Sequence, residues 1–181
     1  MSTQVAEKTI YAIDPVHTNA DFVVRHLMIT RVRGRFPGVA GAIELAAGSD
    51  VPSAVQARID ATTIDTREPQ RDAHLKSADF LEVEKYPAIE FASTRIEGAP
   101  EDFTIHGNLT IHGVTREVAL HAAFEGRGPD PWGGQRVGYS ASTTINRKDF
   151  GLTWNAALET GGVVVGDEVR IELEVEAVLQ K

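Results

Sequence analysis

The chain has 181 residues, a length that suits a single domain. It contains no cysteine, which excludes disulfides, thiolate metal ligands and a cysteine nucleophile. The formal net charge is −8, so the surface as a whole repels phosphate backbones and we expect no nucleic-acid partner.

Residues 1–7 contain no apolar segment and predict a flexible tail rather than a signal peptide. No apolar run approaches the ~20 residues that span a bilayer. We therefore expect a cytoplasmic protein without stable membrane insertion, in which residues 8–181 form a single domain.

The first half of the chain reads as a series of strands. Lys8 to Ile13 predicts a short strand that stops at Asp14-Pro15, because proline fixes φ and lacks a donor. Asn19 to Met28 is apolar on both faces and is expected to be a central strand. Arg31 to Leu45 is interrupted by proline and glycines, which indicates bends that curve a sheet. Ala54 to Ile64 then alternates again as a strand.

The densest basic run of the chain is Arg25 to Arg35. Within it Arg31, Arg33 and Arg35 alternate, so they would share one face of a strand. We interpret this run as a solvated strand face.

The stretch from Arg71 to Pro87 does not alternate and is crowded with charge, so it predicts a short helical connection. Pro69 suits a first helical turn, and Gln70 to Lys76 would make about two turns. Ser77 is a candidate cap for a second short helix through Leu81. We expect this connection to cover one end of the β structure with Phe80 and Leu81 inward.

The second half of the chain returns to strands. Ala88 to Glu97 is one strand, and Gly126 to Gly134 is a loop before a strand at Gln135 to Asn146. Residues 147–160 read as irregular or partly helical. From Glu168 to Ala177, apolar and glutamate residues alternate, which is typical of a half-buried antiparallel strand.

The clearest hairpin joins residues 103–112 to residues 118–124. With Val114-Thr115 as a two-residue turn, Ile111 faces Val118 and every apolar residue meets an apolar partner. That pair is not a typical hairpin turn, so the loop could also be longer.

The same register places His121 opposite Asn108 and diagonal to His106. Two histidines on an exposed face could bind zinc loosely, but no third ligand converges on them. We therefore expect no metal site.

About eight strands with few helices indicate an antiparallel sandwich or barrel. A tall, narrow apolar interior would suit a long, thin apolar molecule, and a filled interior is the alternative that composition leaves open. Small residues at strand positions would leave room inside; they are Ala57, Ala61, Ala92, Gly107, Ala122, Ser140 and Ala177.

Six stretches occur together in one order: residues 12–18 with 21–27, 64–66, 71–75 with 77–80, 86–91, 107–115 and 145–151. In this set the chain resembles the YceI-like family, described as polyisoprenoid-binding and lipocalin-like. The resemblance implies an all-β fold, an extended eight-stranded antiparallel lipocalin-like barrel with one short helical crossover. It also implies an elongated pocket for a polyisoprenoid or an isoprenoid quinone, and carriage rather than catalysis. Many relatives have an export signal that this sequence lacks, which does not favour a periplasmic role.

The candidate ligand-binding residues fall into three groups. Strand phase selects apolar residues for the pocket wall: Phe22, Val24, Phe36, Ile89, Phe91, Leu109, Ile111, Tyr139 and Trp154. Phe80 is expected to reach the pocket from the helical connection. Donors for a headgroup at the pocket mouth are Arg25 and His26 first, with Arg71 and His74 from the connection. For Arg71 we also consider an ion pair with Asp72 that fixes the helix.

The sequence does not favour an enzyme. It contains no Gly-x-Ser-x-Gly motif and no glycine-rich phosphate loop. Asp14 with His17, or Asp72 with His74, are explained by local turn and cap roles. We expect no catalytic residues and no cofactor apart from a bound lipid. A ligand-free stress-related or interaction protein is the alternative function, and a homodimer is plausible because sheet edges invite pairing.

Overall fold

The computed structural model describes residues 7–181, so residues 1–6 of the predicted tail lie outside the described residues. Glu7 is exposed, although its carbonyl oxygen accepts a hydrogen bond of 3.1 Å from the Ala47 N–H. Among residues 7–181 no helix is long and apolar enough to cross a membrane.

The described chain forms one antiparallel sheet with one α-helix and three short 3-10 helices. The strands are β1 Lys8–Ile13, β2 Asn19–His26, β3 Thr30–Arg35, β4 Val39–Ala46, β5 Ala54–Asp60, β6 Ala88–Ala99, β7 Asp102–Ile111, β8 Val114–Pro129, β9 Gln135–Asn146 and β10 Val165–Leu179. The helices are η1 Pro15–His17, η2 Ala61–Thr63, α1 Pro69–Lys76 and η3 Arg147–Phe150.

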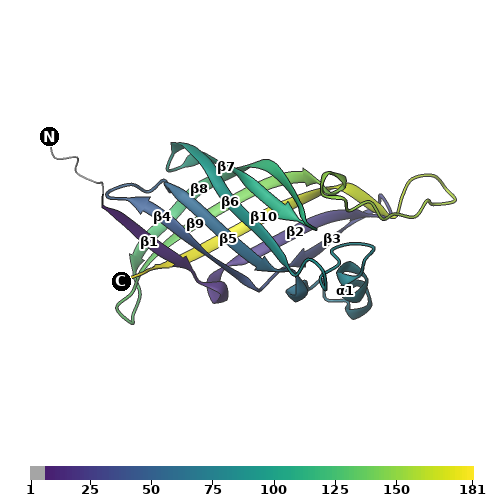
Figure 1. The fold of residues 1–181 in the computed structure, drawn as a ribbon, viewed down its shortest axis with the longest axis horizontal. Helices are drawn as coiled ribbons and strands as arrows, with labels where there is room; N and C mark the ends of the chain where they lie inside the picture. Colours follow the sequence, from purple (N-terminus) through teal and green to yellow (C-terminus); the bar gives the residue numbers. More distant parts are fainter. Residues whose placement is uncertain (1–6) are drawn as a thin grey trace.

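The sheet closes on itself as an elongated barrel (Figure 1). Its order is β1-β4-β5-β6-β7-β8-β9-β10-β2-β3, and β1 also pairs with β10. Because β1 and β2 lie end to end along β10, they occupy one position in the wall. β3 and β4 lie end to end beside them and occupy the next position. The wall therefore has eight strand positions, which confirms the predicted eight-stranded barrel.

The break between β1 and β2 is the point where closure could fail. Here the Asp14 N–H donates to the Glu176 carbonyl at 2.8 Å, and the Thr18 hydroxyl accepts from the Glu176 N–H at 3.2 Å. On the outer face, Arg136 of β9 donates to the carboxylates of Asp14 and Glu176, both at 2.7 Å, and to Asp130 at 2.8 Å. One guanidinium thus fastens the broken strand to β10 and to the β8–β9 loop.

The β7–β8 hairpin has a different register from the predicted one. Its turn is His112-Gly113, with φ of 54° and 71°, which is the positive-φ geometry that two-residue hairpin turns require. Ile111 therefore pairs with Val114 rather than Val118. The shift is four residues, an even number, so every side chain keeps its predicted face.

The corrected register changes the neighbours of His121. That residue faces Thr104, not Asn108. The predicted loop at residues 126–134 is also shorter, because β8 continues to Pro129 through a bulge at Gly126, whose φ is 150°.

The helical connection lies at one end of the barrel, opposite the C-terminus and the start of β1 (Figure 1). It fills the space beyond the end of β5, between β3 and the β7–β8 hairpin. Asp65 forms a bridge with Arg35 of β3, and the Tyr86 ring lies 4.8 Å from the His112 ring. The predicted second helix from Ser77 does not form: residues 78–81 are turns, because the Leu81 N–H returns to the Leu75 carbonyl at 3.0 Å.

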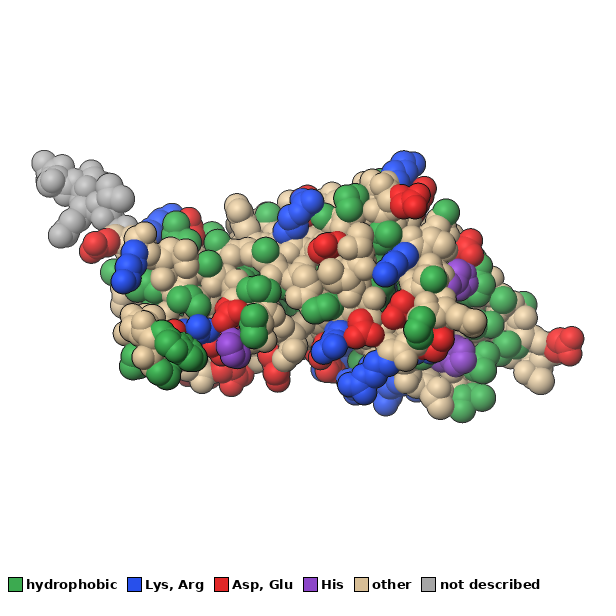
Figure 2. All heavy atoms as spheres, turned by 90° about the horizontal axis from the view of Figure 1, so that it is seen from below, with side chains coloured by type: hydrophobic (Ala, Val, Ile, Leu, Met, Phe, Trp, Pro, Cys, Tyr) green, Lys and Arg blue, Asp and Glu red, His purple; other side chains and the backbone are tan. Residues whose placement is uncertain are grey.

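Charged side chains are scattered among polar and apolar ones on the face of the barrel seen in Figure 2. The interior contains two apolar clusters, one toward each end. The first includes Phe103 and Tyr139, and the second includes Leu81 and Phe150 from the segments that cover the α1 end.

Arg136→Met should make the barrel less stable and change its response to acid. Hydrogen bonds from Arg136 and then His17 lower the pKa of Asp14 to about 2, so its ionised form stabilises the fold above about pH 4 and this contribution is lost as the pH falls toward 2. The stability difference between wild type and variant should therefore be largest near neutral pH and shrink below about pH 3. Urea unfolding between pH 7 and pH 2 measures it.

Arg116→Met is the control, because Arg116 is exposed and its one hydrogen bond among the described residues goes to the Thr115 carbonyl. A difference for Arg136→Met that stayed constant down to pH 2 would show that the carboxylates do not contribute through this arginine.

Candidate ligand-binding cavity

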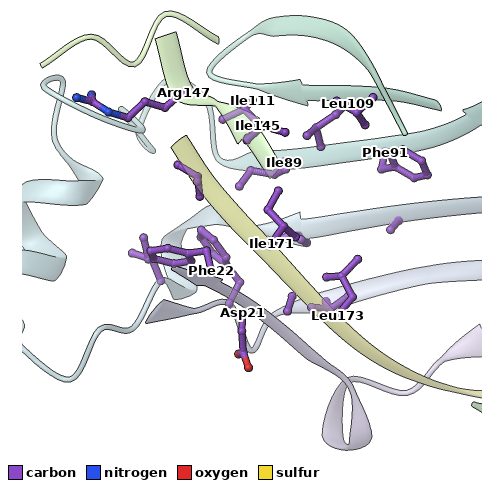
Figure 3. A pocket seen from close by; sticks show the side chains of 18 of the residues that line it. Asp21, Phe22, Ile89, Phe91, Leu109, Ile111, Ile145, Arg147, Ile171 and Leu173 are labelled. Atoms are coloured by element: carbon purple, nitrogen blue, oxygen red, sulfur yellow. The ribbon is translucent and has the colours of Figure 1, made fainter. Parts of the chain in front are cut away.

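The barrel encloses an elongated cavity of about 410 Å³. Its walls are the inward faces of strands from both halves of the chain, and Figure 3 shows Ile89, Phe91, Leu109 and Ile171 directed into it. A volume of this size lies within the range of small-molecule sites. Fifteen residues of β10 make a wall about 38 Å tall, so the space is long relative to its width.

Two glycines leave room on the wall for phenylalanine rings. A Cβ atom at Gly34 would come within 2.2 Å of the Phe22 ring, and one at Gly107 within 2.5 Å of the Phe91 ring. Each ring covers a strand position that has no side chain. The aromatic rings therefore line the cavity without filling it.

One end of the cavity is closed by packed aromatic residues. The Tyr139 hydroxyl donates to the Asp50 carbonyl at 2.8 Å, and its ring packs against Phe103 and Phe124 at 6.0 and 5.6 Å. Burial raises the pKa of Tyr139, so the phenol stays a neutral donor. Phe103 is only 1% exposed, so the cavity ends here in ordinary core.

The other end, which we call the mouth, lies between α1 and the segment after η3. His74 of α1, Phe80 and Trp154 form an aromatic cluster with ring centroids 4.7 to 5.3 Å apart. All three border the cavity. The two covering segments therefore meet through ring contacts and not through a strand ladder.

The predicted headgroup donors all lie at the mouth but differ in how they are held. Arg71 donates to the hydroxyl and carbonyl of Thr66, both at 2.8 Å, and Asp72 accepts from the same residue. The expected Arg71–Asp72 ion pair is therefore replaced by a shared partner, because Thr66 lies between the two side chains. His74 contacts the Asp79 carboxylate at 2.8 Å.

Arg25 and His26 are less constrained than the donors on α1. Arg25 is exposed, and its one side-chain hydrogen bond among residues 7–181 goes to the Met28 carbonyl, at 3.5 Å; His26 is half-buried. These two residues are the donors that a headgroup could engage with least loss of existing contacts.

Arg147 is a cavity residue that the sequence did not single out. It is 3% exposed and donates to the carbonyls of Leu152 at 2.7 Å and Gly166 at 2.8 Å. Burial lowers the pKa of its guanidinium. Because its guanidinium binds a backbone carbonyl at each end of the segment 152–166, Arg147 fixes the position of that segment at the mouth. Its one sequence signal was its place in the recurring stretch 145–151.

All fourteen candidate ligand-binding residues border the cavity. Their contact with a ligand stays a prediction. Among the small residues expected inside, Ala57, Ala122 and Ser140 border the cavity, whereas Ala61 and Ala177 are fully buried. Ala92 is exposed, because its neighbour Phe91 takes the inward position.

Several wall residues were missed although their pattern was visible. The alternating apolar face of β10 forms a large part of the wall, through Val169, Ile171, Leu173 and Val175. Asp21 also borders the cavity, but its carboxylate points away from it (Figure 3). Burial raises the pKa of this carboxyl.

Asp14, His17 and Glu176 are the described residues that come close enough for a metal, with ligand atoms within 4.8 Å of one another. Arg136 donates to both carboxylates and supplies the positive charge there. The geometry is therefore explained by an arginine-centred ion network.

A closed antiparallel barrel of eight strand positions around an elongated apolar cavity defines a lipocalin-like fold. The YceI-like domain model matches residues 11–177. The chain belongs to this family.

Similar proteins agree with this assignment. A UPF0312 protein of Enterobacter sp. (strain 638) is 38% identical over 165 residues, which cover 91% of this chain and 83% of the relative. The crystal structure of the Campylobacter jejuni YceI protein has 28% identity and a TM-score of 0.73, covering 87% of this chain and 90% of that chain. A polyisoprenoid-binding domain from Saccharophagus degradans has the same fold, with 15% identity and a TM-score of 0.68 over 94% of this chain and 98% of its own.

Gly34→Ala should narrow the cavity while the barrel stays folded. The new methyl group overlaps the Phe22 ring, which can turn into the open cavity, so we expect a loss of about 1 kcal/mol in the free energy of unfolding. Uptake of an apolar fluorophore such as N-phenylnaphthylamine should fall. Fluorescence titration and urea unfolding measure the two effects.

Gly128→Ala is the matched control, since a Cβ atom there meets nothing within 4 Å. Equal fluorophore uptake by the two variants would contradict a cavity limited by the Phe22 ring.

Proposed function

We propose that this protein binds and carries the apolar chain of a long amphiphile, with a polyisoprenoid or an isoprenoid quinone as the first ligand class. The observation that carries the proposal is a continuous, largely apolar cavity that is closed at Tyr139 and has the basic side chains of Arg25, His26, Arg71 and His74 at its mouth. A molecule with one long apolar chain and one polar end matches that distribution. The polyisoprenoid-binding description of the similar Saccharophagus degradans domain supports the same class.

The residues at the mouth suggest how the two ends of the ligand would be held. The chain would gain about 25 cal/mol for each Å² of apolar surface buried, so three or four isoprene units could provide micromolar affinity. The headgroup would lie near Arg25 and His26, which keep free donor capacity. No covalent step is part of this proposal.

The alternative is a ligand-free interaction protein with a filled interior. It predicts that Val24→Asp or Phe91→Asp only unfolds the protein. The unfilled cavity beside both residues favours the carrier function instead.

Native mass spectrometry of the purified protein, followed by organic extraction, tests the proposal directly. We expect a long-chain species that dissociates with the protein and is recovered in the organic phase. The same spectrum reports whether the protein forms the predicted homodimer.

Ala57→Leu should weaken ligand binding without unfolding the barrel. Ala57 lies midway along β5 and faces the cavity, so a leucine there occupies space that the ligand would use. We expect affinity for geranylgeraniol to fall about tenfold, a cost near 1.4 kcal/mol. Trp132 is exposed and Trp154 borders the cavity, so Trp154 emission in a Trp132→Phe background reports binding.

Gln56→Leu is the control, because Gln56 is the outward neighbour of Ala57 on the same strand and is exposed. Finding no long-chain species in the purified protein and equal titrations for both leucine variants would overturn the proposal.

A further inference from the structure

The β2–β3 hairpin differs from the rest of the surface in charge. Arg25, Arg31, Arg33 and Arg35 are all exposed on it, and residues 25–35 include no acidic residue, on a chain with a formal net charge of −8. Basic side chains gather in one region of the face seen in Figure 2, toward the α1 end. This local positive region has the opposite sign to the protein as a whole.

Two of these arginines lie directly opposite each other. Arg25 pairs with Arg31 across the two strands, whereas Arg33 contacts Glu172 at 3.7 Å and Arg35 contacts Asp65 at 3.2 Å. Like charges at directly opposed strand positions destabilise a sheet. Within residues 7–181, no carboxylate lies within ion-pair distance of either Arg25 or Arg31. An external anion between them would remove that repulsion.

The tip of the same hairpin is apolar and exposed. Met28 is 51% and Ile29 is 78% exposed, and the backbone of Leu27 and Met28 has φ of 53° and 60°, a costly conformation for these side chains. Apolar residues flanked by arginines match the composition of surfaces that rest in the interface of an anionic bilayer.

The hairpin tip lies beside the mouth of the cavity. The Leu27 N–H donates to the Val164 carbonyl at 2.8 Å, and Val164 borders the cavity. A surface that held this tip in a bilayer would bring the mouth to the lipid.

We propose that the β2–β3 hairpin docks the protein on an anionic lipid bilayer, with Met28 and Ile29 in the interface and Arg25 and Arg31 on lipid phosphates. The inference extends the proposed function by naming the surface from which an apolar ligand enters or leaves. Arg25 belongs to both proposals, but Met28, Ile29 and Arg31 do not border the cavity, so docking and ligand binding can fail separately.

Vesicle flotation tests the docking. Wild-type protein should float with vesicles of equal parts phosphatidylcholine and phosphatidylglycerol, and not with pure phosphatidylcholine. Binding should be strong at ~10 mM salt and lost at ~1 M, where charges are screened within about 3 Å. Absence of flotation at low salt overturns the proposal. A hairpin that binds an acidic protein and not a bilayer would give that result.

Two variants of the hairpin, neither in the cavity wall, localise the effect. Arg31→Glu should weaken vesicle binding at least tenfold, since each basic residue near an anionic surface contributes about fivefold. Ile29→Ser should weaken vesicle binding at ~10 mM salt without changing how steeply the remaining binding falls as salt is added, because serine removes apolar contact and no charge. Glu159 lies in the neighbouring loop and is exposed, so Glu159→Gln should strengthen binding. Val16→Ser and Arg116→Glu are exposed controls away from the hairpin that should bind as wild type does.

Arg31→Glu also separates docking from a simpler role. Arginines on β3 could serve only to stop edge pairing with another chain, and a glutamate would do this equally well. Vesicle binding unchanged by Arg31→Glu would therefore overturn the proposal. Trp154 titration with geranylgeraniol should be unchanged in every hairpin variant; loss of loading with intact flotation would reject the carrier function alone.

Discussion

The structure depends on β10, the strand that closes the sheet. It pairs with β9 on one side and with β1 and β2, laid end to end, on the other. An unpaired β10 would leave two long edges exposed and no enclosed interior. The weakest point of the closure is the break between β1 and β2, where Arg136 and the Glu176 backbone maintain the pairing.

Closure explains both the cavity and its asymmetry. The wall is held by strand pairing almost throughout, and large aromatic residues fill the end near Tyr139. At the α1 end the wall has no strand beyond β5, so a helical connection and the segment after η3 cover it. They are held by ring contacts and by Arg147 rather than by a hydrogen-bond ladder. Movement is therefore least costly at the end where the polar residues and the hairpin tip also lie.

The sequence predicted most of the wall because strand alternation assigns each side chain to a face. That is why every proposed lining residue borders the cavity although the β7–β8 register was shifted by four residues. The turn was misplaced because pairing apolar residues across the hairpin favoured Val114-Thr115. The turn instead forms at His112-Gly113, where the backbone adopts positive φ. Arg147 was missed because a buried arginine has no periodic signal; its partners are backbone carbonyls brought near only by folding.

From the sequence alone, alternation and turn residues thus determined an all-β chain whose strands have one solvent-facing and one apolar face, with one helical interruption. Those are local properties, set by neighbours two to four residues apart. The tertiary structure alone decided that β1 and β2 share one position, that glycines under Phe22 and Phe91 leave the interior open, and that Arg25 and Arg31 oppose each other beside the mouth. Each of these depends on which distant strands pair, and pairing is settled only when the sheet closes.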